Sequence, residues 1–205
     1  MSKEVRLKVP FSEEDINKLN LEDVVYVDGF VFTARDEAHK RAVREQQEPP
    51  SGLKKFNINV MFHTGPAVKR ENGKWRVCVA GPTTANRMER WIPEMIRKFN
   101  LRGILSKGLL GGITSEACVE YGCVFLTSLG GESAAMYSSG IHPIAEAVFW
   151  MDLGAPEAVW VLRVENFGPW IVAIDARGNN LFDPITDQIK NRILQAYEKL
   201  GPAPD

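Results

Sequence analysis

The order of strand and helix patterns along the chain constrains its fold more than any other feature of the sequence. Segments rich in apolar and β-branched residues predict strands at 5–9, 24–27, 30–34, 58–62, 74–79, 103–106, 123–128, 158–164 and 170–175. Helical patterns separate some of these segments, at about 36–46, 83–99 and 114–121. Because the alternation is irregular, it predicts a mixed α/β fold, with a mixed sheet flanked by helices, rather than a regular doubly wound sheet.

Turn and capping residues define several element boundaries. Asp28 and Gly29 both tolerate positive φ, so we expect a two-residue hairpin turn between the second and third predicted strands. Ser12, with Asp15 three residues later, is typical of a capped short helix. Pro93 either kinks the helix that contains it or starts a second helix in its first turn.

The last helical pattern begins at Asp183, with Pro184 in its first turn. One face of this helix is apolar, and the residues that form it are Ile185, Ile189, Ile193, Tyr197 and Leu200. Gly201 and Pro202 are expected to end it.

The composition is that of a globular domain, and we expect residues 1–205 to form a single one, since 44% of them are hydrophobic and 25% charged. The net charge is −1, from 25 Lys and Arg against 26 Asp and Glu, which gives no overall attraction to nucleic acid or to an anionic membrane. Neither a long apolar run nor a leader-like N-terminus is present. These features predict a cytoplasmic protein that binds neither nucleic acid nor membrane.

The three cysteines, at 78, 118 and 123, are odd in number and form no C-x-x-C pair. A disulfide framework or a complete four-thiolate metal site is therefore not expected. We expect all three to be free thiols buried in the core of a protein from a reducing compartment.

Polar and cationic residues directly follow three of the predicted strands. They are Arg35, Thr83 with Arg87, and Lys107. In α/β structures, ligands gather at the carboxyl ends of strands. The sequence therefore predicts an anion site built from local cations rather than from the net charge of the chain.

The segment from Gly81 to Arg87 carries the most specific of these signals. Gly81 allows close backbone approach, and free N–H groups at a helix start favour an anion. Thr83 and Arg87 are four residues apart, so in a helix they would share a face and cradle a carboxylate. The alternative is that Thr83 or Thr84 is an ordinary helix cap and Arg87 a solvated surface residue.

The other candidates are weaker when taken alone. Arg35 would equally suit the charged, exposed start of a helix, and Lys107 an exposed glycine-rich loop. That loop lacks the spacing of a phosphate-binding loop, which argues against nucleotide binding. His63 ends a strand and could line the same pocket, but a packed loop histidine is the simpler interpretation. No two histidines have the spacing of metal ligands.

Four segments occur in register and resemble one family. They are TARDEAHKR at residues 33–41, GPTTANRM at 81–88, SKG at 106–108 and IVAID at 171–175. Together they resemble the β subunit, or C-terminal domain, of class I fumarate hydratases and L(+)-tartrate dehydratases. The resemblance runs over nearly the whole chain and includes GAPEAVW at residues 154–160.

The resemblance implies a swivelling β/β/α domain and a hydro-lyase that converts fumarate to L-malate reversibly. It also implies a 4Fe–4S cluster that is held by cysteines of a separate α subunit and acts as a Lewis acid. The implied partners are that α subunit and a small dicarboxylate substrate, in a homo-oligomer or an α2β2-type assembly. We expect no cofactor on this chain alone.

The resemblance also implies roles for individual residues. Thr83 matches the proposed catalytic base, Arg35 and Arg87 match arginines that grip the substrate carboxylates, and Lys107 completes the anion site. We assign Thr84 beside them as a further substrate-binding residue. A threonine hydroxyl is a poor base without a basic neighbour, and the sequence offers no convincing one, which favours a second polypeptide.

Two alternatives remain open at this point. The first is dehydration of L-tartrate or a related 2-hydroxy acid, because Asn86 and Leu109 depart from the family's usual residues in ways that bear on substrate choice. The second is a carboxylate-binding module without catalysis.

Overall fold

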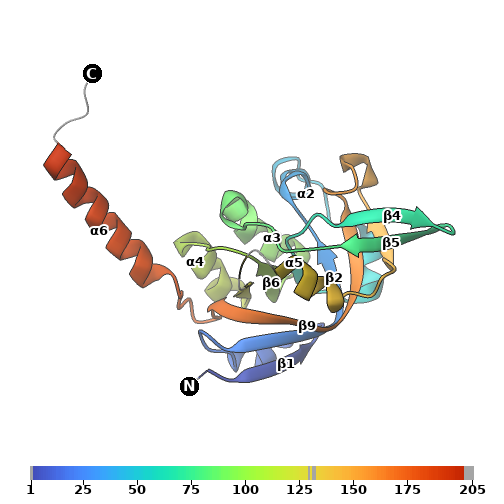
Figure 1. Ribbon diagram of the computed structural model, residues 1–205, viewed down its shortest axis with the longest axis horizontal. Helices are drawn as coiled ribbons and strands as arrows, with labels where there is room; N and C mark the ends of the chain where they lie inside the picture. The colour runs from blue at the N-terminus through green and yellow to red at the C-terminus, as the bar shows by residue number, and fades with distance from the viewer. Residues whose placement is uncertain (1, 129, 131–132, 201–205) are drawn as a thin grey trace.

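The computed structural model describes residues 2–128, 130 and 133–200, and its main element is a seven-stranded mixed sheet (Figure 1). Its strands are β1 Glu4–Lys8, β2 Val24–Thr33, β3 Val60–Phe62, β6 Gly103–Ser106, β7 Val124–Thr127, β8 Ala147–Phe149 and β9 Val159–Ile174. They are ordered β1-β2-β3-β6-β7-β9-β8. The first five are parallel, whereas β9 is antiparallel to its neighbours. The mixed α/β fold predicted from the sequence is confirmed.

Strand β9 closes the sheet on itself. It pairs with β7, where Phe125 lies opposite Ile174, and also with β2, where Val24 lies opposite Ile171. Strands β2, β3, β6, β7 and β9 therefore form a closed ring of hydrogen-bonded neighbours. Closure pairs both sides of every strand in the ring and fixes where each strand ends.

Successive side chains along the ring belong to two different cores. In β7, Val124 and Leu126 belong to one cluster and Phe125 to the other. The cluster that contains Phe125 also contains residues of the helices α3 (Ile92–Phe99) and α4 (Gly112–Tyr121), so it lies outside the ring. The other cluster is the inner core, where Tyr137 of α5 (Ser133–Ser139) stacks on Trp170 with ring centroids 4.1 Å apart.

Two strand predictions are corrected by the ring. The expected hairpin turn at Asp28-Gly29 is wrong, because β2 runs through both residues without reversing. Gly29 does adopt a φ of 117°, but its conformation accompanies register shifts against β9, so it bends one strand rather than joining two. Likewise, the two strands expected at 158–164 and 170–175 are parts of the single long strand β9.

The helix predictions are largely confirmed. Ser12 and Asp15 form a capping box at the start of α1 (Glu13–Asn17). The helix expected at 36–46 begins as α2 (Asp36–His39) and continues as one turn of π-helix at Lys40–Arg44. Pro93 lies in the first turn of α3, after a 3-10 helix at Asn86–Trp91, so it starts a second helix rather than kinking one.

A separate two-stranded sheet is formed by β4 (Ala67–Glu71) and β5 (Lys74–Val79), which projects as a hairpin in Figure 1. Its turn residues Asn72 and Gly73 have φ values of 49° and 77°. Cys78 points outward from β5 and is exposed, so the expectation that all three cysteines are buried is wrong at this position. In β5 it is Val77 that faces the core.

The C-terminal helix α6 (Asp183–Leu200) extends away from the rest of the protein (Figure 1). Ile185, Ile189 and Ile193 share one face, as predicted, and are 56%, 51% and 48% exposed. The side chains of Tyr197 and Leu200, the terminating residues Gly201 and Pro202, and residues 131–132 lie outside the described part of the protein. None of the helices that the structure describes combines the length and apolarity needed to cross a membrane.

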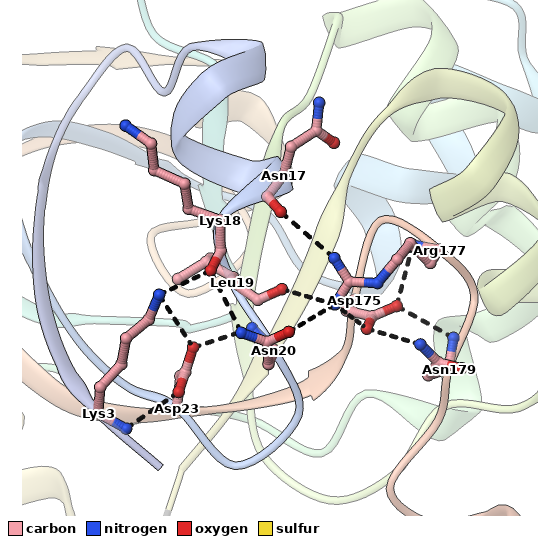
Figure 2. A network of polar contacts seen from close by, with 9 residues as sticks. All are labelled: Lys3, Asn17, Lys18, Leu19, Asn20, Asp23, Asp175, Arg177 and Asn179. Atoms are coloured by element: carbon pink, nitrogen blue, oxygen red, sulfur yellow. Dashed lines mark hydrogen bonds and ion pairs between the residues drawn. The ribbon is translucent and has the colours of Figure 1, made fainter. Parts of the chain in front are cut away.

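A polar network joins the chain after β9 to the N-terminal segment (Figure 2). Asp175 is 1% exposed and accepts hydrogen bonds from the backbone N–H groups of Arg177 and Asn179 and from both of their side chains. Arg177 in turn donates to the carbonyl of Leu19 at 2.9 Å and to the side chain of Asn20 at 3.1 Å. The aspartate of the IVAID segment therefore has a structural role.

Replacing Asp175 with Asn is expected to lower the free energy of unfolding by about 1–3 kcal/mol, because a charged acceptor of several buried hydrogen bonds is lost. Urea unfolding measures this change. Asp183→Asn is the control, since Asp183 is exposed and its loss is expected to cost less than about 0.5 kcal/mol. Equal stability of both variants would contradict the structural role of Asp175.

Candidate active site

The predicted site residues meet at one edge of the main sheet. The parallel strands β2, β3 and β6 are adjacent, so their carboxyl ends lie side by side. Arg35 follows β2, His63 follows β3 and Lys107 follows β6. The expectation that Arg35 and Lys107 lie at strand ends is therefore confirmed.

Thr83 reaches the same edge by another route. It follows β5, which ends at Val79 as predicted but belongs to the small two-stranded sheet rather than to the main sheet. Instead, backbone hydrogen bonds attach it between two of the strand ends. The N–H of Thr83 donates to the carbonyl of His63 at 2.7 Å, and its own carbonyl accepts from the N–H of Lys107 at 3.2 Å and the hydroxyl of Ser106 at 2.7 Å.

The expected helix N-terminus with free N–H groups is not what this segment forms. The N–H of Thr83 is bonded to His63, and the N–H of Ala85 donates to the carbonyl of Lys107 at 3.0 Å. Helical structure begins only at Asn86. Because this segment is bonded to two strand ends, the N–H groups of Thr83 and Ala85 are not available to an anion.

Arg87 nevertheless lies beside Thr83. Its Nη2 donates to Oγ1 of Thr83 at 3.3 Å. Its Nε and Nη2 also form a two-pronged ion pair with Asp36, at 2.8 and 2.9 Å. The hydrogen bond from Arg87 lowers the pKa of the Asp36 carboxyl, and the same bond raises the pKa of Arg87. Arg87 is therefore solvent-accessible, as the alternative interpretation expected, but it is held in place.

Arg35 is held by a second carboxylate. Its Nη2 lies 3.3 Å from Oε1 of Glu157, and its side chain is 28% exposed. The other carboxylate oxygen of Glu157 accepts from the N–H of Glu37 at 3.0 Å. Gly65 makes room for the guanidinium, because a Cβ at this position would lie 2.6 Å from Nη1 of Arg35. Arg35 is thus partly enclosed rather than a free surface residue.

Lys107 and Thr84 complete the edge. Both are half-buried, and their backbones form an isolated parallel bridge. Gly108 follows with a φ of 81°. A Cβ added at this position would lie 3.4 Å from the methyl group of Thr84. Among the described residues, no carboxylate pairs with the ammonium group of Lys107, unlike the guanidinium groups of Arg35 and Arg87.

Two histidines lie in the buried layer beneath these side chains. His63 is 0% exposed, which agrees with the interpretation of a packed histidine rather than one that lines a pocket. His39, at the end of α2, is equally buried and contacts it. Burial lowers the pKa of His39 to about 4, and burial also holds the pKa of His63 well below 6.5. Both rings are therefore neutral at physiological pH.

Sequence reasoning missed Asp36, Glu157 and His39 as parts of this region. Asp36 and His39 lie one and four residues after Arg35, so the helix expected from about residue 36 brings both close to it. That helix was predicted, and it was the available signal. Glu157 lies in the loop before β9, and only the tertiary fold brings it to Arg35.

The cysteines do not fit an iron–sulfur cluster. Cys118 and Cys123 are buried in the outer core, whereas Cys78 is exposed on β5. Burial, followed by a hydrogen bond with Cys118, raises the pKa of the Cys123 thiol well above its usual value. In the described part of the chain, no three His, Cys, Asp or Glu side chains are grouped as metal ligands.

Comparisons with known proteins point to one family. A model of the family described as Fumarase C-terminus matches residues 1–185. The chain is 36% identical over 194 residues to a protein of Methanocaldococcus jannaschii named "Putative L(+)-tartrate dehydratase subunit beta", with 93% of each chain covered. It is 34% identical to the "L(+)-tartrate dehydratase subunit beta" of Escherichia coli K12, with 89% of this chain and 94% of the relative covered.

A longer relative is also similar. The chain is 36% identical over 195 residues to a Geobacillus stearothermophilus protein named "Putative fumarate hydratase class I". The alignment covers 95% of this chain but 36% of that protein.

The buried neutral histidines predict how stability depends on pH. The folded pKa of His39, about 4, lies below its unfolded value of 6.5, so the unfolded state binds more protons between these values. The free energy of unfolding should fall by about 1.4 kcal/mol per pH unit for each buried histidine as the pH drops below 6.5. Unfolding in urea between about pH 7 and pH 5 measures this, because carboxylates remain largely ionised there. A flat profile over this range would contradict it.

Proposed function

The chain belongs to the Fumarase C-terminus family, and from this premise we propose that it is the β subunit of an iron–sulfur hydro-lyase that hydrates fumarate to L-malate reversibly. The hydro-lyase class and the β-subunit type follow from the relatives, whose names are dehydratase subunit beta and fumarate hydratase class I. The proposal adds fumarate as substrate, residues 1–205 as one catalytic domain, and a role for each site residue.

The observation that carries the proposal is the convergence of Arg35, Thr83, Arg87 and Lys107 on one sheet edge. Hydrogen bonds link Thr83 to the loops after β3 and β6, and Arg87 to Thr83. Two guanidinium groups and one ammonium group suit a small substrate with two carboxylates, since the planar guanidinium matches carboxylate geometry. Thr84 lies beside Lys107 and is proposed as a further substrate contact.

In the dehydration direction, we assign Thr83 to remove the proton from the carbon next to the carbinol carbon. The electron pair of the broken C–H bond moves toward the adjacent carboxylate, where Arg35, Arg87 and Lys107 stabilise the developing charge. It then forms the carbon–carbon double bond as the C–O bond breaks, and the departing hydroxyl takes a proton, whose donor we assign to the partner subunit, to leave as water. Arg87 supports this role, because a guanidinium that donates to Oγ1 of Thr83 stabilises the deprotonated oxygen. Thr83 still needs a group that accepts its own proton, which we assign to the partner subunit.

We place the 4Fe–4S cluster on a separate α subunit, because Cys78 is exposed on β5 whereas Cys118 and Cys123 are buried in the outer core, and burial raises the pKa of the Cys123 thiol well above its usual value. Such a cluster supplies a Lewis acid to the departing hydroxyl when it is present. We propose a homo-oligomer or an α2β2-type assembly. The three free thiols favour the reducing cytoplasm as its location.

The second candidate is L-tartrate dehydration. The relatives that the chain matches over most of their length carry this activity in their names, whereas the fumarate hydratase is matched over 36% of its length. The two substrates differ in the hydroxyl groups they carry. A pocket that hydrogen-bonds an additional hydroxyl rejects the substrate that lacks it by up to about 10⁴-fold.

A substrate panel separates these candidates. The chain, co-expressed with its cluster-bearing α subunit and assayed without oxygen, is expected to show a higher kcat/KM for fumarate and L-malate than for L-tartrate. If L-tartrate is the better substrate by about 10²-fold or more, the chain is a tartrate dehydratase subunit instead.

Replacing Thr83 with Ala is expected to lower kcat by about 10²–10⁴-fold, because the hydroxyl that transfers the proton is removed. Thr83→Ser keeps a hydroxyl at the same position and should retain much more activity, so it is the matched control. Undiminished kcat in Thr83→Ala would show that the role assigned to Thr83 is wrong.

A further inference from the structure

Two histidine rings meet directly beneath the proposed site. His39 is the last residue of α2, and His63 follows β3. Their Nε2 atoms are 3.1 Å apart, and both residues are 0% exposed. At its other nitrogen, Nδ1, His39 lies 2.8 Å from the backbone carbonyl of Arg35. The ring of Trp91 lies next to His39, with centroids 6.3 Å apart.

The geometry determines which nitrogens carry hydrogen. The carbonyl of Arg35 only accepts, so Nδ1 of His39 must be the donor. A neutral ring carries one hydrogen, and therefore Nε2 of His39 is an acceptor. Nε2 of His63 must then donate to it, which leaves the lone pair at Nδ1 of His63. Among the described residues, this nitrogen is buried without a hydrogen-bond partner.

Each histidine is hydrogen-bonded to the backbone of one site residue, His39 to Arg35 and His63 to Thr83. The carbonyl of Arg35 accepts from both Nδ1 and the N–H of His39, the latter at 2.9 Å. Arg35 is the N-cap of α2, and its own side chain makes no capping hydrogen bond. On the other side, the carbonyl of His63 accepts from the N–H of Thr83 at 2.7 Å, and the N–H of His63 donates to Leu105 of β6 at 2.8 Å. The chain of hydrogen bonds thus runs from Arg35 to Thr83 through two rings.

We propose that His39 and His63 are positioning residues that set the distance between Arg35 and Thr83. The hydrogen bond between the rings joins α2, which follows β2, to the segment after β3, so that Arg35 and Thr83 contact the same substrate molecule. This inference rests on the proposed function for its consequence in catalysis, but the hydrogen-bond arrangement itself is testable on the chain alone.

The charged side chains that act on the two histidines are residues of the candidate site itself. Asp36 and Arg87 are near enough to act electrostatically on His39, and Arg87 also acts on His63. These two charges belong to one ion pair, with Nε and Oδ1 2.8 Å apart. The pair of rings therefore lies under a locally neutral pair of charges, which favours neutral imidazoles.

The first test is ¹⁵N NMR of the full chain, labelled at its three histidines. His39 is expected as the Nδ1–H tautomer and His63 as the Nε2–H tautomer, both neutral at neutral pH. His142 is exposed and provides the internal reference signal. The opposite tautomer at either ring, or a charged ring at neutral pH, would overturn the arrangement whatever the chain catalyses.

The second test uses variants in the reconstituted complex. His63→Leu removes the ring-to-ring hydrogen bond and is expected to lower kcat/KM by about 10–100-fold, with changes in both kcat and KM. His63→Gln retains an N–H donor near the position of Nε2 and should recover a large part of this loss. His39→Leu and His39→Asn form the same comparison for the bond to Arg35. His142→Leu is the control on an exposed histidine, with kcat and KM expected to be unchanged.

The outcomes separate the two ideas. If the wild-type complex has no hydro-lyase activity, the proposed function is wrong. The NMR experiment still tests the hydrogen bonds between His39, His63 and Arg35. If the wild type is active and folded His63→Leu keeps the same kcat and KM, the histidines serve stability alone and the positioning role is wrong. Equal losses in His63→Leu and His63→Gln, without rescue, would also contradict it.

Discussion

The pairing of β9 with both β2 and β7 is the constraint on which the rest of the structure depends. It closes the ring, divides the side chains into an inner and an outer core, and leaves the parallel strands β2, β3 and β6 with a common carboxyl edge. A closed ring resists sliding of one strand past another, because a register shift would have to propagate through every neighbour. Residues placed at the ends of these strands therefore keep fixed separations. The candidate site uses this rigidity, with Arg35 and Lys107 at two strand ends and Thr83 attached to the third.

Holding the arginines in place is the second requirement of such a site. A long flexible side chain loses conformational entropy when a ligand orders it, and a partner within the protein reduces this loss. Asp36 binds Arg87 through two nitrogens, and Glu157 binds Arg35. The same carboxylates offset the cationic charges that converge on the edge. Lys107 differs, because in the described part of the protein its ammonium group faces no carboxylate. It is the strand-end cation whose charge is fully available to an anion.

Sequence patterns predicted what local chemistry determines and missed what only the ring determines. The capping box at Ser12 and the helix start at Pro93 follow from neighbouring residues, and the structure confirms them. The hairpin at Asp28-Gly29 was wrong because a positive φ at one glycine permits a bend as readily as a reversal, and pairing with β9 selects the bend. At the site, resemblance identified the cations, but the contact between Arg35 and Glu157 joins residues more than a hundred positions apart. No local pattern encodes such a contact.

Asp36 and Glu157, the carboxylates beside the site, indicate where the group that accepts the proton of Thr83 must come from. Both oxygens of Asp36 accept hydrogen bonds from Arg87, while those of Glu157 interact with Arg35 and with the N–H of Glu37. The ion pair lowers the pKa of Asp36 further, which makes it a weaker base. The two histidines beneath are buried, and their hydrogen-bonding nitrogens are directed to each other and to the backbone of Arg35. A hydroxyl that already accepts from Arg87 therefore has nearby carboxylates that are paired elsewhere. Nδ1 of His63, which has no hydrogen-bond partner among the described residues, belongs to a buried ring whose pKa is held well below 6.5, so it is a weak base. A second polypeptide that brings a free carboxylate to Thr83 is the arrangement that this chemistry favours.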